Sequence, residues 1–173
     1  MTPEKCELLF SSKYDGDFTF AFDNIADYDL IHEKLKMLRK YAESKTIKFY
    51  VLVGFESTDA KDIENAFKRI ALLMEYKCLP YIMRYQDKNY QPWKESKYRG
   101  MYVTLARWAN QPSFLKKKSF RQYCEANQEY AANPKELCAS MRALIDFEKE
   151  NPDIAKKYFD LRFDGIYDHN YQN

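Results

Sequence analysis

The chain has 173 residues, of which 46% are hydrophobic and 17% aromatic, so it can bury a core and does not have the composition of a disordered protein. The formal net charge of +2 names no partner, but residues 84–121 hold ten Lys or Arg against two Asp or Glu, and acidic segments flank them. No stretch approaches the roughly 20 apolar residues of a membrane-spanning helix, and the first residues lack a signal-peptide pattern, so we expect a cytoplasmic protein with no membrane partner.

Three segments in the first half have the pattern of β-strands. Three Phe alternate with smaller residues in 18–23, which is the two-residue period of a strand. Residues 49–55 form a continuous apolar run, which is typical of a parallel strand covered on both faces. Residues 79–85 form the third segment, with Pro80 near its start, where a strand tolerates proline.

Helical periodicity separates these strands. Residues 27–43 and a segment from Thr58 or Asp59 to about Lys77 carry apolar residues at three- and four-residue spacing. A shorter helix is predicted over 3–12. The strands begin about 30 residues apart with one helix in each interval, which predicts consecutive right-handed βαβ units of a parallel α/β fold.

The second half of the chain changes character after the third strand. A polar loop is expected over 86–98, followed by helices over 98–110, 120–131, 134–148 and 151–160, a break at Pro112, and a frayed tail over 167–173. We therefore expect a βα part over residues 1–88 and a helical C-terminal region over 89–173, packed together as one domain.

Ligands of parallel α/β folds bind where the strands end, and five residues there can form hydrogen bonds or expose backbone. They are Asp23, Asn24, Gly54, Glu56 and Arg84. Gly54 suits either a tight turn or a close approach by a ligand. Asp23 and Asn24 suit either helix capping or ligand contact. Arg84 would pair with Asp23 or Glu56, or would lie at a solvated edge.

A second group of residues mixes positive charge with aromatic rings. Such a mixture binds phosphates and stacks bases in nucleic-acid-binding proteins, although the rings could instead pack in the core while the lysines face water. The candidates for a nucleic-acid site are Arg107, Trp108, Lys116, Lys117, Lys118 and Arg121.

Motifs that carry catalysis are missing from the sequence. There is no phosphate-binding loop, no Ser/His/Asp set and no zinc signature, so we assign no catalytic residue. The four cysteines, Cys6, Cys78, Cys124 and Cys138, lie too far apart for a short metal-binding motif, and we expect free thiols that are mostly buried and hold no metal.

Segments 18–25, 48–55 and 79–85 resemble the C-terminal half of radical S-adenosylmethionine enzymes, and the resemblance extends weakly into 105–110. It covers about residues 4–122. It implies that the three strands correspond to strands four to six of a partial (β/α)₆ barrel, an incomplete TIM barrel. It also implies S-adenosylmethionine as the ligand, with Leu52, Gly54, Met83 and Asp23 at ligand-contacting positions.

The sequence departs from that family in three respects. The C-x₃-C-x₂-C motif that binds the 4Fe–4S cluster is absent, as is the Gly-rich segment of the family's second strand. Of the family's G-x-I-x-G-x-x-E pattern, Leu52 and Gly54 fit, whereas Tyr50 and Ser57 stand where Gly and Glu would be. Radical chemistry belongs to the iron–sulfur cluster, so the resemblance implies an enzyme only when an N-terminal half supplies the cysteines.

Three functions therefore remain open. The chain is a radical S-adenosylmethionine-like half-barrel that is inactive alone, a nucleic-acid-binding module, or an interaction domain without a ligand. Three parallel strands would leave two unpaired edges, unless the helical C-terminal region covers one of them, and this predicts self-association or a complementary N-terminal half.

Overall fold

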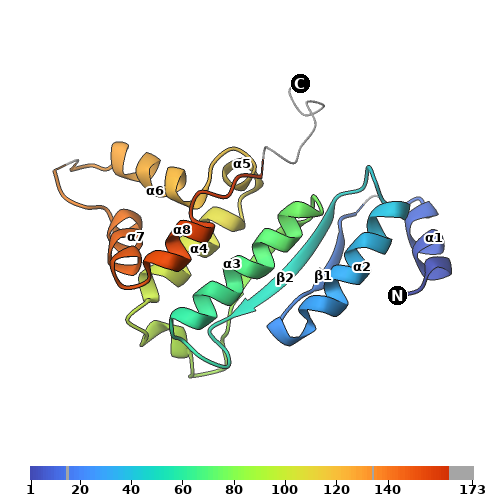
Figure 1. Ribbon diagram of the computed structural model, residues 1–173, viewed down its shortest axis with the longest axis horizontal. Helices are drawn as coiled ribbons and strands as arrows, with labels where there is room; N and C mark the ends of the chain where they lie inside the picture. The colour runs from blue at the N-terminus through green and yellow to red at the C-terminus, as the bar shows by residue number, and fades with distance from the viewer. Residues whose placement is uncertain (15, 134, 164–173) are drawn as a thin grey trace.

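The computed structural model describes residues 1–14, 16–133 and 135–163 (Figure 1). Three strands alternate with helices in the first half, and helices make up the second. The strands are β1 (Phe18–Ala21), β2 (Ile47–Val53) and β3 (Leu79–Arg84). The helices are α1 (Pro3–Ser11), α2 (Tyr28–Tyr41), α3 (Ala60–Glu75), α4 (Arg99–Ala109), α5 (Pro112–Leu115), α6 (Phe120–Glu129), α7 (Ala139–Glu150) and α8 (Pro152–Tyr158), with short 3₁₀ helices η1 (Ile25–Asp27) and η2 (Pro92–Lys94).

The strands form one parallel sheet in the order β1-β2-β3, which confirms the predicted parallel α/β arrangement. Tyr50 in the central strand lies opposite Ala21 of β1 and Tyr81 of β3. Because this register aligns the strands, their carboxyl ends lie together at the same end of the sheet.

Within the described residues, helices cover only one face of this sheet. The β2 side chains that point toward α2 and α3 are buried, namely Ile47, Phe49, Val51 and Val53. On the opposite face Tyr50 is 43% exposed and Tyr81 44% exposed, and their rings meet edge to face at 5.7 Å. The expectation that β2 is covered on both faces is therefore wrong, because the apolar run includes Tyr50, whose phenol tolerates water. We call the uncovered side the open face.

Local capping explains where the helices of the βα part begin. The Asp59 carboxylate accepts hydrogen bonds from the backbone N–H groups of Lys61 and Asp62, at 2.9 and 3.1 Å, and so starts α3. Asp27 stands at the N-cap position of α2 but makes no side-chain cap hydrogen bond. Asn24 takes that role one turn earlier, because its side chain accepts from Ala26 N and starts η1.

One hydrophobic core joins the βα part to the C-terminal helices. The ring of Phe67 on α3 contacts Trp108 of α4, Phe120 of α6, and Tyr158 and Phe159 at the end of α8. Such aromatic contacts hold α3 between the sheet and the second half of the chain (Figure 1).

The C-terminal helices match the predicted segments with two differences. The helix expected over 134–148 begins at Ala139, and Pro134 lies outside the described residues. Pro112 does not simply end a helix, because it occupies the first position of the short α5, where its missing N–H is not needed. The frayed tail expected over 167–173 also lies outside the described residues. None of the helices in the described part of the chain is long and apolar enough to cross a membrane.

The outer edge of β3 is held by the side chain of Asn110, which follows α4. The Ile82 N–H donates to Asn110 Oδ1 at 2.6 Å, and Asn110 Nδ2 donates to the Ile82 carbonyl oxygen at 3.0 Å. The amide therefore occupies both hydrogen-bonding groups of one edge residue, as a neighbouring strand would.

We expect Asn110→Ala to lower the free energy of unfolding by about 1–3 kcal/mol, because a half-buried peptide would lose both partners. Urea unfolding of the two proteins measures the difference. The exposed Gln111→Ala is the matched control and should change stability by less than about 0.5 kcal/mol. Equal losses in the two variants would contradict a bridging role for Asn110.

Candidate functional site

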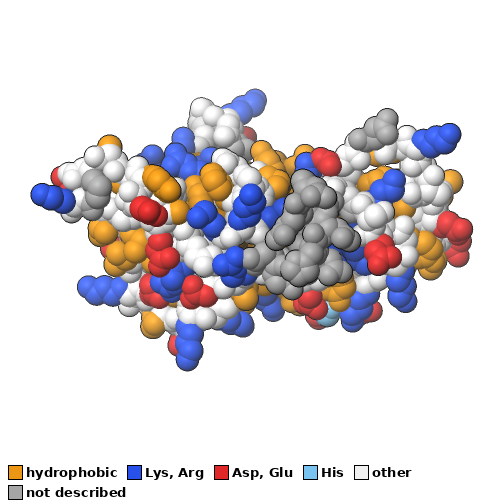
Figure 2. All heavy atoms as spheres, turned by 90° about the horizontal axis from the view of Figure 1, so that it is seen from above, with side chains coloured by type: hydrophobic (Ala, Val, Ile, Leu, Met, Phe, Trp, Pro, Cys, Tyr) orange, Lys and Arg blue, Asp and Glu red, His pale blue; other side chains and the backbone are white. Residues whose placement is uncertain are grey.

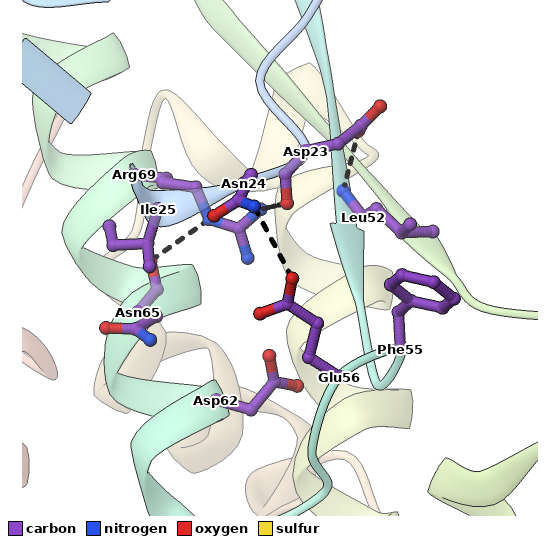
Figure 3. A pocket seen from close by; sticks show the side chains of 9 residues that line it. All are labelled: Asp23, Asn24, Ile25, Leu52, Phe55, Glu56, Asp62, Asn65 and Arg69. Carbon is purple, nitrogen blue, oxygen red and sulfur yellow. Dashed lines mark hydrogen bonds between the residues drawn. The ribbon is translucent and has the colours of Figure 1, made fainter. Parts of the chain in front are cut away.

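A small cavity of about 140 Å³ lies at the carboxyl ends of β1 and β2 (Figure 3). Its walls come from the segment after β1, the end of β2 and one side of α3. The lining residues are Asp23, Asn24, Ile25, Leu52, Phe55, Glu56, Asp62, Asn65 and Arg69. We call this the strand-end cavity.

Arg69 forms the base of the strand-end cavity although it is only 2% exposed. Its Nη1 donates to the carbonyl oxygens of Phe22 and Asp23 at 3.0 and 2.7 Å, and its Nε donates to the carbonyl oxygen of Asn65 at 3.2 Å. The guanidinium therefore ties α3 to the end of β1. Its remaining nitrogen, Nη2, points into the cavity toward Glu56 (Figure 3).

Carboxylates surround this cation. Burial lowers the pKa of the Arg69 guanidinium, while the charges of Asp62, Asp23 and Glu56 oppose that shift. A guanidinium stays protonated in proteins, so the cavity combines one fixed positive charge with three carboxyl groups. Such a set suits a ligand that carries both an ammonium or other cationic group and a carboxylate.

Asp62 is held by two donors on the side of the cavity nearest β2. Its Oδ2 accepts from the Gly54 N–H at 2.8 Å and from the Tyr102 hydroxyl at 2.7 Å. Burial raises the pKa of Asp62 in spite of these hydrogen bonds, and burial together with Asp62 raises the pKa of Tyr102. Asp62 thus links the turn after β2 to α4.

The raised pKa of Asp62 predicts a pH effect on stability. Its carboxylate binds a proton more readily in the folded than in the unfolded state, so its contribution to the free energy of unfolding falls as pH rises from its unfolded toward its folded pKa. We expect this decline to be absent from Asp62→Asn. The difference between the two urea-unfolding curves across the acid range measures it, and a difference that is flat with pH would contradict the raised pKa.

Four of the seven residues predicted at the strand ends meet in the cavity. Asp23 Oδ1 accepts from the Leu52 N–H at 3.2 Å, and Asn24 Nδ2 donates to Glu56 Oε1 at 3.4 Å. Asp23, Asn24, Leu52 and Glu56 all line the cavity. The structure therefore places the ends of β1 and β2 side by side with their polar side chains on one rim.

Gly54 lies behind the cavity and not in its wall. Its φ of +70° is a left-handed conformation that favours glycine, and a Cβ there would come within 2.8 Å of the Trp93 Cβ. Of the two explanations considered for Gly54, the tight turn accounts for the residue in this structure.

Met83 and Arg84 lie outside the cavity. Met83 is on the open face and 44% exposed, beside Leu52 in the register of the sheet. The Arg84 guanidinium lies over the Trp93 ring, 4.6 Å from its centroid, so the favoured pairing with Asp23 or Glu56 is wrong. Arg84 lies opposite Val53 and points to the helical side of the sheet, which separates it from the carboxylates.

Sequence reasoning missed the three α3 residues of the site. Asp62, Asn65 and Arg69 occupy positions i, i+3 and i+7, which share one face of a helix. A polar row next to the apolar stripe of a helix that follows a Gly-ended strand was the signal that could have identified them.

The predicted nucleic-acid residues do not form one exposed surface. Trp108 is 1% exposed and its Nε1 donates to the Lys118 carbonyl oxygen, so its ring cannot stack on a base. Arg121 pairs with Glu148 and Asp160. Figure 2 shows Lys and Arg side chains gathered over the face of α5 and α6, with acidic and hydrophobic side chains among them. Arg107 is exposed on α4.

The four cysteines are free thiols; Cys6, Cys78 and Cys124 are buried, and Cys138 is half-buried. Within residues 1–14, 16–133 and 135–163, no three His, Cys, Asp or Glu side chains are grouped so that they could hold a metal ion. These residues therefore do not fit an iron–sulfur cluster, and we assign none of them to one.

Comparison with known family models, curated proteins and solved structures finds no match to this chain. The interpretation of the site therefore rests on its geometry and on the sequence patterns.

Proposed function

We propose that the chain is the C-terminal half of a radical S-adenosylmethionine-type partial barrel and acts only with a complementary half that carries the cluster cysteines. The observation that supports this most is the strand-end cavity, which lies at the carboxyl ends of parallel strands beside an uncovered sheet face. Ligand sites of parallel barrels occupy this position.

The chemistry of the cavity fits part of S-adenosylmethionine. The carboxylates of Asp23, Glu56 and Asp62 suit its positively charged amino and sulfonium groups, and Arg69 Nη2 suits its carboxylate. When bound with a cluster, the cofactor would supply the radical chemistry, while these residues would bind and orient its amino acid end.

The size of the cavity limits what this chain binds alone. A volume of about 140 Å³ is well below the roughly 300–1,000 Å³ of typical small-molecule sites. The rest of the ligand would lie on the open face near Leu52 and Met83, where a complementary half would enclose it. This is the physical reason to expect weak binding by the chain alone and no activity.

Isothermal titration calorimetry with S-adenosylmethionine tests the proposal. We expect measurable binding by the wild-type chain and about 10- to 100-fold weaker binding by Glu56→Gln, because a charge-assisted contact is lost. Glu64→Gln is the matched control, since Glu64 does not line the strand-end cavity and pairs with Lys61 at the surface. Absence of any heat with the wild type, or equal weakening in both variants, would contradict this site.

A second candidate function, binding of a nucleic acid, is favoured by one observation. Arg84, Arg107 and Gln111 line a recess of about 260 Å³ beside α4. Neither arginine has an ion-pair partner within the described residues, and partial burial together with Arg107 lowers the pKa of Arg84. Phosphate groups of a nucleic acid would pair with these two positive charges.

Fluorescence anisotropy with a single-stranded oligonucleotide at two salt concentrations tests this second candidate. Binding should weaken with salt, and the double variant Arg84→Gln/Arg107→Gln should lose most of it. Replacing Lys116, Lys117 and Lys118 by Glu should weaken it further if the basic segment takes part. Unchanged binding in both sets of variants would exclude this segment as a nucleic-acid site.

A further inference from the structure

The two edges of the sheet differ in their capacity to accept another strand. On β3, the Tyr85 N–H donates to the Val53 carbonyl oxygen, so the peptide groups of Pro80, Ile82 and Arg84 face away from β2. Pro80 has no N–H, and Ile82 is occupied by Asn110. Two consecutive outward positions are therefore blocked, and the β3 edge is closed.

Among the described residues, nothing protects the β1 edge in a comparable way. The Phe22 N–H donates to the Tyr50 carbonyl oxygen at 2.8 Å, so by alternation the peptide groups of Thr19 and Ala21 face away from β2. Both residues are small and exposed, and no group in the described chain is hydrogen-bonded to their backbone. This edge presents free donors and acceptors, the condition under which a sheet accepts another strand.

The position of α1 indicates the direction of the strand that would be added. Each of α1, α2 and α3 precedes a strand, and α1 packs beside α2 on the helical side of the sheet (Figure 1). The Phe10 ring of α1 meets the Phe18 ring of β1 at 4.9 Å. A helix in this place is the crossover of a βαβ unit, and such a unit joins two parallel strands.

We propose that the outer edge of β1 accepts one strand of a partner polypeptide, parallel to β1, and that the β3 edge accepts none. This inference rests on the proposed function, since the partner it names is the complementary, cysteine-bearing half. The open face supports the same partner: Tyr50, Tyr81 and Met83 are exposed on a parallel sheet, and all-parallel sheets are normally covered on both faces.

A second copy of the chain is the competing occupant. A twofold axis at this edge would pair β1 with the copy's β1 in antiparallel order. That arrangement would leave α1 outside any βαβ unit, so the parallel partner fits the layer of helices better.

The test mixes the full chain with a purified N-terminal half of a radical S-adenosylmethionine barrel, consisting of its first three βα units and bearing C-x₃-C-x₂-C. We expect a one-to-one complex in which the amides of Thr19 and Ala21 become protected from hydrogen exchange. Ala21→Pro, and Thr19→Pro as a second variant, should weaken the complex at least about 10-fold, since each removes one outward donor and places a ring at the edge. Arg84→Pro at the β3 edge is the matched control and should leave the affinity unchanged.

The direction of the added strand relative to β1 is tested with a nitroxide spin label on the introduced cysteine of the double variant Asp17→Cys/Cys138→Ser. The remaining thiols of this variant are buried. Broadening of the NMR signals from the beginning of the partner's strand supports the parallel order. Broadening of the signals from the end of that strand overturns it. Light scattering of the chain alone should give a monomer; a dimer lost in Ala21→Pro would overturn the inference in favour of a second copy.

Different results would contradict the β1 inference and the half-barrel proposal. A complex of unchanged affinity in both proline variants would overturn the β1 inference and leave the half-barrel proposal intact. Absence of a complex together with absence of S-adenosylmethionine binding would overturn both.

Discussion

Arg69→Met is expected to lower the free energy of unfolding by about 3–5 kcal/mol, because it removes the positive partner of a buried charge network. Methionine retains the apolar stem but leaves the carbonyl oxygens of Phe22 and Asp23 without their donor. It also leaves Asp62 buried without the nearby cation. Urea unfolding at pH 7 measures the loss.

Two further variants identify the cause of that loss. Arg69→Lys keeps the charge but cannot reach both strand-end carbonyls and the Asn65 carbonyl in one plane, so it should recover only part of the stability. Lys68→Met changes the exposed neighbour on α3, which contacts the Tyr28 ring, and should cost no more than about 1 kcal/mol. An Arg69→Met protein within about 1 kcal/mol of wild type would contradict the network.

The arrangement of strands and helices in the first half could be predicted because it depends on local patterns. The alternating Phe in 18–23 have the two-residue period of a strand, and the apolar stripe of α3 has the period of a helix. The spacing of the strands along the chain then predicts their parallel order. The coverage of β2 could not be predicted in the same way. A continuous apolar run buries one face and tolerates water on the other when a tyrosine supplies the hydroxyl.

The candidate site was predictable only where the strand ends define it. Asp23, Asn24 and Glu56 follow strands directly, and the parallel order brings them together. Arg69 is separated by 46 residues from Asp23, and only the packing of α3 against the sheet brings its guanidinium within hydrogen-bonding distance of the Asp23 carbonyl oxygen. The error at Arg84 has a simple origin: alternate residues of a strand face opposite sides, and the register places Arg84 on the helical side.

Gly54→Val is expected to lower the free energy of unfolding by about 2–5 kcal/mol, from two causes that add. A β-branched residue is strained at a φ of +70°, and its Cβ would lie 2.8 Å from the Trp93 Cβ. Trp93 cannot move freely, because its Nε1 donates to the Tyr85 carbonyl oxygen at 2.9 Å and Arg84 stacks on its ring. Thermal and urea unfolding measure the loss.

Gly16→Ala provides the matched control for this variant. The atoms nearest to a Cβ at Gly16 would be the hydroxyl and ring atoms of the exposed Tyr14 side chain, which can rotate away, so stability should change by less than about 1 kcal/mol. If both substitutions had equally small effects, the left-handed turn and the Trp93 contact would not explain why position 54 requires glycine. Gly54 would then need another explanation, and close approach of a ligand to the end of β2 would be the alternative to test by calorimetry.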